Sequence, residues 1–332
     1  EADQTIGAGY IMIDWPVVER FRVIAGLRVE YTNMNVTNNV DKNDTKFKSG
    51  GFEKWDPLPS LNLIFKVTEE MNLRLAGSQT IARPAFREIG TNYYDYKLGI
   101  FVQGNQDLKR ALITNVDLRW EWFFKRGEKL ALSGFYKHFQ DPIEQKLSAT
   151  TQNFEIKYVN TDETDLYGFE FEFRKKLDFI GFLRDFSFGG NFTYVHSVVK
   201  LTEEELAKRR IGDPDAEDTR PMIGQAPYVF NAYLGYENDS ISLESNIGFN
   251  VTGEKLLLIT QGSTPYIFEQ PYPSLNFNIN KGIGKHFTLE LSVDNILDPK
   301  YEAVHHFDTG DRYYVRYSLG RTYKLGIKYH IN

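Results

Sequence analysis

The sequence predicts an all-β protein, a transmembrane antiparallel up-and-down barrel, and three observations lead to this prediction. Apolar and polar residues alternate along many segments, as on strands with one face in lipid and the other in water. Connections between these segments alternate between short turns and long polar loops. Aromatic residues make up 15% of a chain that is only 41% hydrophobic, which is typical of barrels with aromatic bands at both membrane interfaces.

The alternation predicts about thirteen strands. In one of them, Tyr167, Phe169 and Phe171 place aromatic rings on one face. Glu170 and Glu172 lie between these rings and point to the other face. The same two-residue period recurs to the end of the chain. The predicted strands span residues 5–15, 20–36, 57–67, 71–82, 111–124, 128–140, 163–176, 185–199, 226–237, 240–252, 272–283, 286–297 and 316–331.

The connections fall into two alternating classes. Outer-membrane barrels place short turns in the periplasm and long loops outside the cell, so we expect the long class to be extracellular. Within one long loop, Glu203–Arg210 is expected to form a short helix. The short connections are 16–19, 68–70, 125–127, 177–184, 238–239 and 284–285, and the long ones are 37–56, 83–110, 141–162, 200–225, 253–271 and 298–315.

The strand count is odd, which indicates part of a larger barrel. The first predicted strand starts on the long-loop side, and the last ends on the short-turn side. Bacterial single-chain barrels usually have an even number of strands. An open alternative is a miscount, because 302–308 and 312–317 could form one more hairpin.

Composition and motifs exclude several classes of function. The chain has no cysteine, which excludes disulfides and thiol chemistry. Its net charge of −6 argues against a nucleic-acid partner. No GxSxG turn, HExxH helix or phosphate loop is present, so we expect neither an enzyme nor a cofactor. The acidic segment 213–218 lacks the spacing of a calcium-binding EF-hand, and we expect no metal site.

Four segments resemble the C-terminal barrel of TonB-dependent outer-membrane receptors of the Bacteroidetes type. Ser78–Ile89 looks like the end of a strand in that family with the start of its outer loop. Gly104–Lys109 (GNQDLK) is similar to the family's GNPDLKPE, although Arg110-Ala111 replaces the usual Pro-Glu. Val293–Tyr301 resembles its NLFDKKY near the C-terminus, and Gly320–Tyr323 opens the final strand as expected.

This resemblance implies that residues 1–332 are the C-terminal portion of a 22-stranded barrel whose plug domain and earlier strands are not present. The intact protein would be an outer-membrane receptor that binds a scarce solute, of the siderophore, cobalamin, sugar or peptide class, and imports it with TonB-coupled energy. Its implied partners are outer-membrane lipids, its own plug, the TonB complex and the solute, with room for a surface lipoprotein. The alternatives left open are a passive porin or surface-binding barrel, a soluble β-sandwich protein and a barrel enzyme.

One long loop carries most of the ligand-binding candidates. Arginine binds carboxylate or phosphate with two parallel hydrogen bonds, and tyrosine offers contact area at low entropic cost. An aromatic collar at the membrane interface is the alternative explanation. His305 and His306 are further ligand candidates, although we expect them in a free loop. The candidates in the first loop are Arg83, Arg87, Tyr93, Tyr94 and Tyr96.

Charged residues on the water-facing side of the strands are expected to form a polar lumen wall. Such a wall would cradle a plug and conduct solute. The alternative is a solvated or mutually paired face on which no single residue is essential. The predicted wall residues are Arg119, Glu121, Glu170, Glu172, Arg174 and Glu244.

Overall fold

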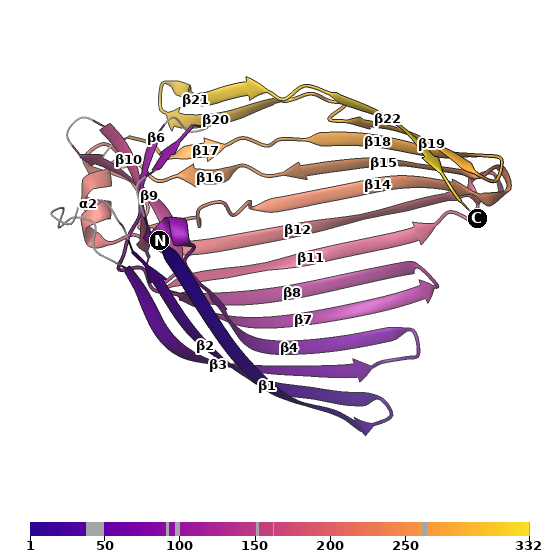
Figure 1. Cartoon of the computed structure of the whole chain (residues 1–332), viewed down its shortest axis with the longest axis horizontal. Coiled ribbons are helices and arrows are strands. Elements are labelled where there is room, and N and C mark those ends of the chain that lie inside the picture. Colours follow the sequence, from indigo (N-terminus) through magenta and orange to yellow (C-terminus); the bar gives the residue numbers. More distant parts are fainter. Residues whose placement is uncertain are drawn as a thin grey trace.

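One large antiparallel sheet dominates the protein (Figure 1). A computed structural model describes residues 1–37, 50–90, 93–96, 100–150, 153–161, 163–260 and 264–331. Thirteen strands, called the wall below, follow one another in chain order, and each pairs with its neighbours. They are β1 (Ala2–Val18), β2 (Phe21–Val36), β3 (Gly50–Lys66), β4 (Met71–Ala82), β7 (Ala111–Lys125), β8 (Glu128–Gln140), β11 (Thr164–Lys176), β12 (Phe186–Lys200), β14 (Tyr228–Asn238), β15 (Leu243–Thr252), β18 (Ser274–Ile283), β19 (Phe287–Asp294) and β22 (Thr322–Tyr329).

This wall confirms the predicted all-β, up-and-down barrel architecture with thirteen strands. Among the described residues, β1 pairs only with β2 and β22 only with β19, so the wall has two edges. Short turns lie at one end and long connections at the other, and the two chain ends lie at opposite ends of the wall (Figure 1). None of the described helices has the length and apolar character needed to cross a membrane.

The two faces of the wall have the polarity expected of a barrel in lipid. On β7, Leu118 is 50% exposed, whereas Glu121 on the other face is only 8% exposed. Phe171 on β11 is also exposed, and its neighbour Glu172 forms ion pairs on the opposite face. A sheet that buries carboxylates and exposes large apolar side chains is suited to hydrocarbon outside and water inside. The predicted face assignment is therefore confirmed on these strands.

Local residue choice explains the tight turns. Gly127 between β7 and β8 has φ +83°, and Gly284 between β18 and β19 has φ +64°. Glycine adopts this left-handed region without steric cost, so both strand pairs can reverse in a few residues. Ser242 ends the connection between β14 and β15 with φ +50°. As a result, β15 begins at Leu243 and not at the predicted residue 240.

Some strand boundaries differ from the prediction. β3 starts at Gly50 instead of 57, although Pro57 and Pro59 lie within it. The register leaves both prolines where β3 pairs with β2 alone, and a residue without an N–H is tolerated at such a one-sided position. The final strand was predicted over 316–331 but splits, because residues up to Ser318 belong to β21 and Gly320 adopts φ +77°.

The long connections contain regular structure, which the sequence analysis had described as loops. We call these elements together the outer layer. The additional hairpin considered at 302–308 and 312–317 exists as β20–β21, outside the wall, so the count of thirteen holds. The outer layer comprises β5 (Tyr93–Asp95), β6 (Ile100–Gln103), β9 (Ile143–Thr150), β10 (Asn153–Asn160), β13 (Thr219–Arg220), β16 (Lys255–Leu258), β17 (Ile267–Glu269), β20 (Lys300–Phe307), β21 (Gly310–Ser318), α1 (Phe86–Ile89) and α2 (Glu203–Arg210). Two 3₁₀ turns, Gly181–Leu183 and Asp239–Ile241, lie in the short connections.

The helix predicted at Glu203–Arg210 is confirmed as α2. Thr202 caps it by accepting a hydrogen bond from the Glu205 N–H, and the Glu205 carboxylate in turn accepts from the Thr202 N–H. This reciprocal capping box satisfies two backbone donors at the start of the helix. Acidic residues in the first turn and basic residues in the last complement the helix dipole.

Candidate functional site

The outer layer consists mainly of two four-stranded sheets. One has the order β5-β6-β10-β9 and the other β16-β17-β20-β21. A single parallel bridge between Lys146, in β9, and Ile259, just after β16, joins them. Both sheets lie at the long-connection end of the wall (Figure 1). Residues from four long connections therefore share one structured unit.

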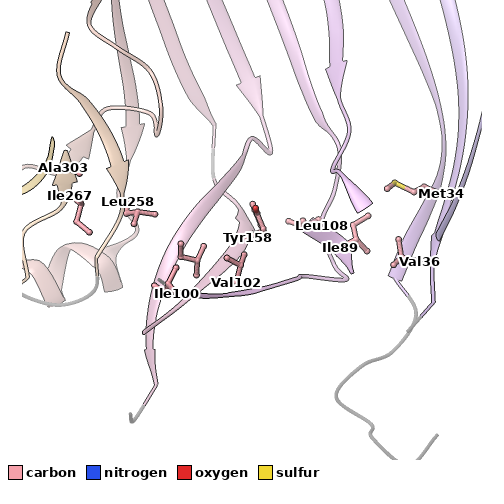
Figure 2. Close-up of a cluster of buried hydrophobic side chains, with 11 residues drawn as sticks. Met34, Val36, Ile89, Ile100, Val102, Leu108, Tyr158, Leu258, Ile267 and Ala303 are labelled. Atoms are coloured by element: carbon pink, nitrogen blue, oxygen red, sulfur yellow. The ribbon is translucent and has the colours of Figure 1, made fainter. Parts of the chain in front are cut away.

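A hydrophobic core holds this unit together (Figure 2). In contrast to the wall, this core has its apolar side chains packed against one another and removed from water. The wall contributes the far end of β2, so the outer layer packs directly onto it. The core residues are Met34, Val36, Ile89, Ile100, Val102, Leu108, Ile156, Tyr158, Leu258, Ile267 and Ala303.

The segment that resembles the family's GNPDLKPE has a structural role. The Asn105 amide donates to the Tyr158 carbonyl at 2.9 Å, and its backbone N–H donates to the Glu88 carbonyl at 2.6 Å. Gly104 packs so closely on Gly90 that an added Cβ would lie 2.1 Å from the Gly90 carbonyl oxygen. The motif therefore fixes the path of the chain between α1, β6 and β10.

Arg83, the first ligand candidate, is tied to the wall. Its Nε donates to Thr32 Oγ1 at 2.9 Å, and its Nη2 pairs with the Glu30 carboxylate. Glu30 also accepts from Arg28 Nε at 2.5 Å. These bonds occupy two nitrogens of the Arg83 guanidinium, which gives this residue a structural role at the rim. Its role in ligand binding stays a prediction.

Arg87 and Tyr93 lie together at the edge of the hydrophobic core. The Arg87 guanidinium is 5.6 Å from the centroid of the Tyr93 ring. The hydroxyls of Tyr93 and Tyr158 are 3.2 Å apart, and Gln145 donates to the Tyr158 hydroxyl at 3.1 Å. Burial, with the hydrogen bond to Tyr93, raises the pKa of Tyr158, so this hydroxyl stays protonated at physiological pH.

Tyr94, Tyr96 and Phe101 form an exposed group that we call the aromatic platform. The Tyr94 ring centroid is 5.1 Å from that of Tyr96 and 5.1 Å from that of Phe101, and both contacts are edge-to-face. Tyr96 is 90% exposed, and the other two rings are also exposed. An open cluster of preordered rings is a chemically suitable surface for the flat or apolar part of a ligand.

His305 and His306 lie on β20, in the other sheet, so the expected free loop is wrong. His305 Nδ1 is 2.7 Å from the Pro265 carbonyl oxygen. His306 contacts Glu254 and Asp311. Adjacent residues on a strand point to opposite faces, and the two imidazoles accordingly have different partners. The described residues contain no group of three or more His, Asp or Glu side chains placed to hold a metal.

Three of the predicted wall residues form an ionic ladder across four strands. Arg119 Nη2 is 3.0 Å from Glu172 Oε2, and Arg119 Nε is 2.9 Å from Glu121 Oε1. Lys129 extends the ladder to Glu172 at 2.7 Å, and Arg74 extends it to Glu121 at 2.9 Å. Two carboxylates thus pair with three cations, an arrangement of the kind described by the mutually paired alternative.

The other wall candidates lie outside this ladder. Glu170 and Arg174 are on β11, and neither forms a salt bridge with another described residue. Glu244 lines a hollow of about 330 Å³ near the short turns, together with Asn280 and Lys328. Six predicted wall residues thus divide between a paired ladder and a more open polar surface.

Sequence reasoning missed a buried ion pair within the outer layer, between β9 and β13. Arg220 Nη2 is 2.6 Å from Glu144 Oε2, and the two side chains are 4% and 2% exposed. The Ile223 N–H also donates to Glu144 Oε1 at 3.0 Å. The partners are 76 residues apart, so no local pattern in the sequence indicates their contact.

The sequence was compared with protein families and curated proteins. The family described as TonB dependent receptor-like, beta-barrel, matches residues 1–296. Two curated relatives from Vibrio cholerae serotype O1, each called iron-regulated outer membrane virulence protein, are 22% and 21% identical to this chain. Each match covers 93% of this chain but only 43% of the relative, so the chain spans about two fifths of their length.

Solved structures were compared in the same way. The copper transporter OprC aligns with a TM-score of 0.69 at 14% identity, over 99% of this chain and 48% of its own. The siderophore receptor PiuA from Acinetobacter baumannii aligns with a TM-score of 0.68 at 13% identity, over 99% and 43%. At such low identity these likenesses concern the fold.

Proposed function

This chain belongs to the TonB-dependent receptor β-barrel family and lies in the outer membrane, and from this premise we propose that it serves solute import. We propose that it is the C-terminal part of a receptor that binds a scarce solute outside the cell. In the whole protein, a plug and further strands would complete the barrel, and the TonB complex would supply the energy. The share of the curated relatives that the chain covers, 43%, supports this division.

For the solute we propose a metal chelate of the siderophore class. The name of the curated relatives refers to iron regulation, which favours this class over cobalamin, sugars or peptides. Assignment to the Bacteroidetes type stays a prediction, because both of those relatives come from Vibrio cholerae.

The observation that carries the proposal is the aromatic platform on a structured outer layer. Tyr94, Tyr96 and Phe101 are exposed, yet Phe101 lies on β6 between the core residues Ile100 and Val102, and Tyr94 lies on the paired strand β5. Rings held in place before binding lose little entropy when a ligand arrives. Arg87, which lies over the Tyr93 ring in the same long connection, offers an exposed cation for an anionic part of the chelate.

The experiment uses the whole receptor in a Gram-negative strain that lacks its own siderophore receptors. Radiolabelled ferric siderophores are offered with and without a functional TonB complex, and surface binding and uptake are measured separately. We expect uptake to require TonB, while surface binding persists without it. Uptake that is equal in both strains would instead support a passive porin.

A platform variant tests the binding residues. Replacing Tyr94 and Tyr96 together by alanine should weaken surface binding by about tenfold, which corresponds to about 1.4 kcal/mol. Tyr313→Ala, an exposed tyrosine on β21 in the other sheet, is the matched control and should leave the affinity unchanged. Equal affinities for the platform variant and the unmodified receptor would remove the platform from the binding site.

A further inference from the structure

His306 lies between two carboxylates that come from different segments of the outer layer. Its Nδ1 is 2.7 Å from Asp311 Oδ1, and its Nε2 is 3.0 Å from Glu254 Oε2. Asp311 belongs to the same hairpin as His306, β20–β21, whereas Glu254 immediately precedes β16. The imidazole therefore links the hairpin to the other half of its sheet.

Few other polar contacts hold the hairpin there, although Ala303 packs in the hydrophobic core and the Gln270 N–H donates to the Glu302 carbonyl at 2.9 Å. β20 pairs with β17 over only three residues, Ile267–Glu269. The Tyr301 hydroxyl donates to Glu269 at 3.0 Å, and His305 contacts the Pro265 carbonyl. Because the ladder is so short, the bond from His306 to Glu254 is a large part of the polar attachment between the hairpin and the β16 segment.

The arrangement requires a particular protonation state. A neutral imidazole has one N–H and one lone pair, so it donates to one carboxylate and presents its lone pair to the other. An imidazolium ion donates from both nitrogens and forms a charge-assisted hydrogen bond with each carboxylate. The observed contacts with Asp311 and Glu254 are therefore both favourable only when both ring nitrogens of His306 are protonated.

We propose that His306 is a proton-operated latch, which fastens the β20–β21 hairpin to the β16–β17 segment when protonated and releases it when deprotonated. The hairpin lies at the long-connection end, which is predicted to be extracellular, so the latch would make that surface sensitive to the acidity of the medium. This inference does not depend on the identity of the solute.

The surroundings of His306 set the direction of the response. Burial alone would lower the pKa of His306, but hydrogen bonds and charges from Asp311 and Glu254 outweigh burial and raise it above its usual value. Because the pKa of His306 is raised on folding, the latch stabilises the attached hairpin fully below about pH 6.5, the ordinary histidine pKa. Its contribution is lost as pH rises through the higher folded-state pKa.

The neighbouring groups on each packed element do not compete for the imidazole. On β17, the Phe268 ring contacts the His306 ring in a tilted arrangement with centroids 5.2 Å apart, and Glu269 pairs with Lys255 at 2.8 Å. Gln270 donates to Glu254 and so holds that carboxylate in place. On the hairpin, no hydrogen bond or ion pair within the described residues joins Asp308 or Arg312 to His306.

Hydrogen exchange on the whole receptor in detergent tests the latch. Exchange of the β20–β21 amides is followed from about pH 5.5 to about pH 8.5, after correction for the intrinsic effect of pH on exchange. In the unmodified protein, protection of the hairpin should fall several-fold across this range. In His306→Gln the corrected protection should be low and independent of pH.

Its sequence neighbour supplies the control. His305 donates to a backbone carbonyl, which does not titrate, so His305→Gln should retain the pH response. Glu254→Gln removes one of the two charges while keeping the size of the side chain, and should weaken the response even if His306→Gln folds poorly. A pH response that survives in both His306→Gln and Glu254→Gln, or that disappears in His305→Gln, would overturn the proposal.

Discussion

The wall and the outer layer bury opposite kinds of side chain, although they alternate along the same chain. In the wall, Leu118 and Phe171 are exposed while Glu121 is nearly buried. In the outer layer, Ile156 and Leu258 are buried in an apolar core. The difference shows that the surrounding medium, and not the strand pattern alone, decides which face is hidden. In hydrocarbon, apolar side chains are stable on the outside of the protein, whereas in water they are stable in its interior.

The ion pair of Glu144 in the outer layer differs in exposure from that of Glu172 in the wall. Glu144 and Arg220 in the outer layer are almost fully removed from solvent, whereas Glu172 in the wall keeps 32% of its side chain exposed. Breaking a pair costs most where the remaining charge cannot reach water. Matched substitutions in the two regions therefore give a direct test of the comparison.

The largest effect is expected for Glu144→Gln. This change leaves Arg220 charged and buried without its counter-ion, which should cost about 3–5 kcal/mol of local stability. Hydrogen exchange of β9 and β13 in the whole receptor measures the loss. The double variant Glu144→Leu with Arg220→Met is the control, because it leaves no uncompensated charge and should recover most of the stability.

Phe171→Arg should have the next largest effect. Phe171 lies midway along β11 on the lipid-facing side, and a charge near the middle of the bilayer costs about 2–4 kcal/mol. Urea unfolding of the receptor refolded into lipid vesicles measures it. Phe171→Leu keeps the face apolar and should behave like the unmodified protein. An equal loss for leucine and arginine would mean that packing, and not lipid, governs this position.

The smallest effect is expected for Glu172→Gln, the wall counterpart of Glu144→Gln. Arg119 and Lys129 lose a partner but remain partly exposed to water, and Arg119 keeps its pair with Glu121, so the cost should stay below about 1 kcal/mol. The same vesicle unfolding assay measures it. A loss as large as that of Glu144→Gln would contradict the idea that the lumen side of the wall is wet.

The sequence was sufficient to predict the wall because its signal is local. The alternation of apolar and polar residues assigns the two faces of β7 or β11 without knowledge of the neighbouring strand. All thirteen wall strands were found in this way, with errors confined to their ends. The first part of β3 was not predicted, because Pro57 and Pro59 lie in it and proline within a segment normally argues against a strand.

The outer layer was not predictable in this way because its contacts are not local. Arg83 was proposed as a ligand contact, but its partners Glu30 and Thr32 lie on a strand about fifty residues earlier. His306 is 52 residues from Glu254. Short strands such as β16 and β17 carry too few residues to show a period. Residue types suggested binding chemistry here, while the topology determines which of them meet.

The bridge between Lys146 and Ile259 has a practical consequence for engineering. Because it joins the two small sheets, none of the four described connections that build these sheets is structurally independent of the others. Replacing one of these connections by that of a relative would break the bridge between the two sheets and expose the hydrophobic core beneath it. Transplanting specificity to another scaffold should therefore succeed only when all the interlocked loops move as one graft.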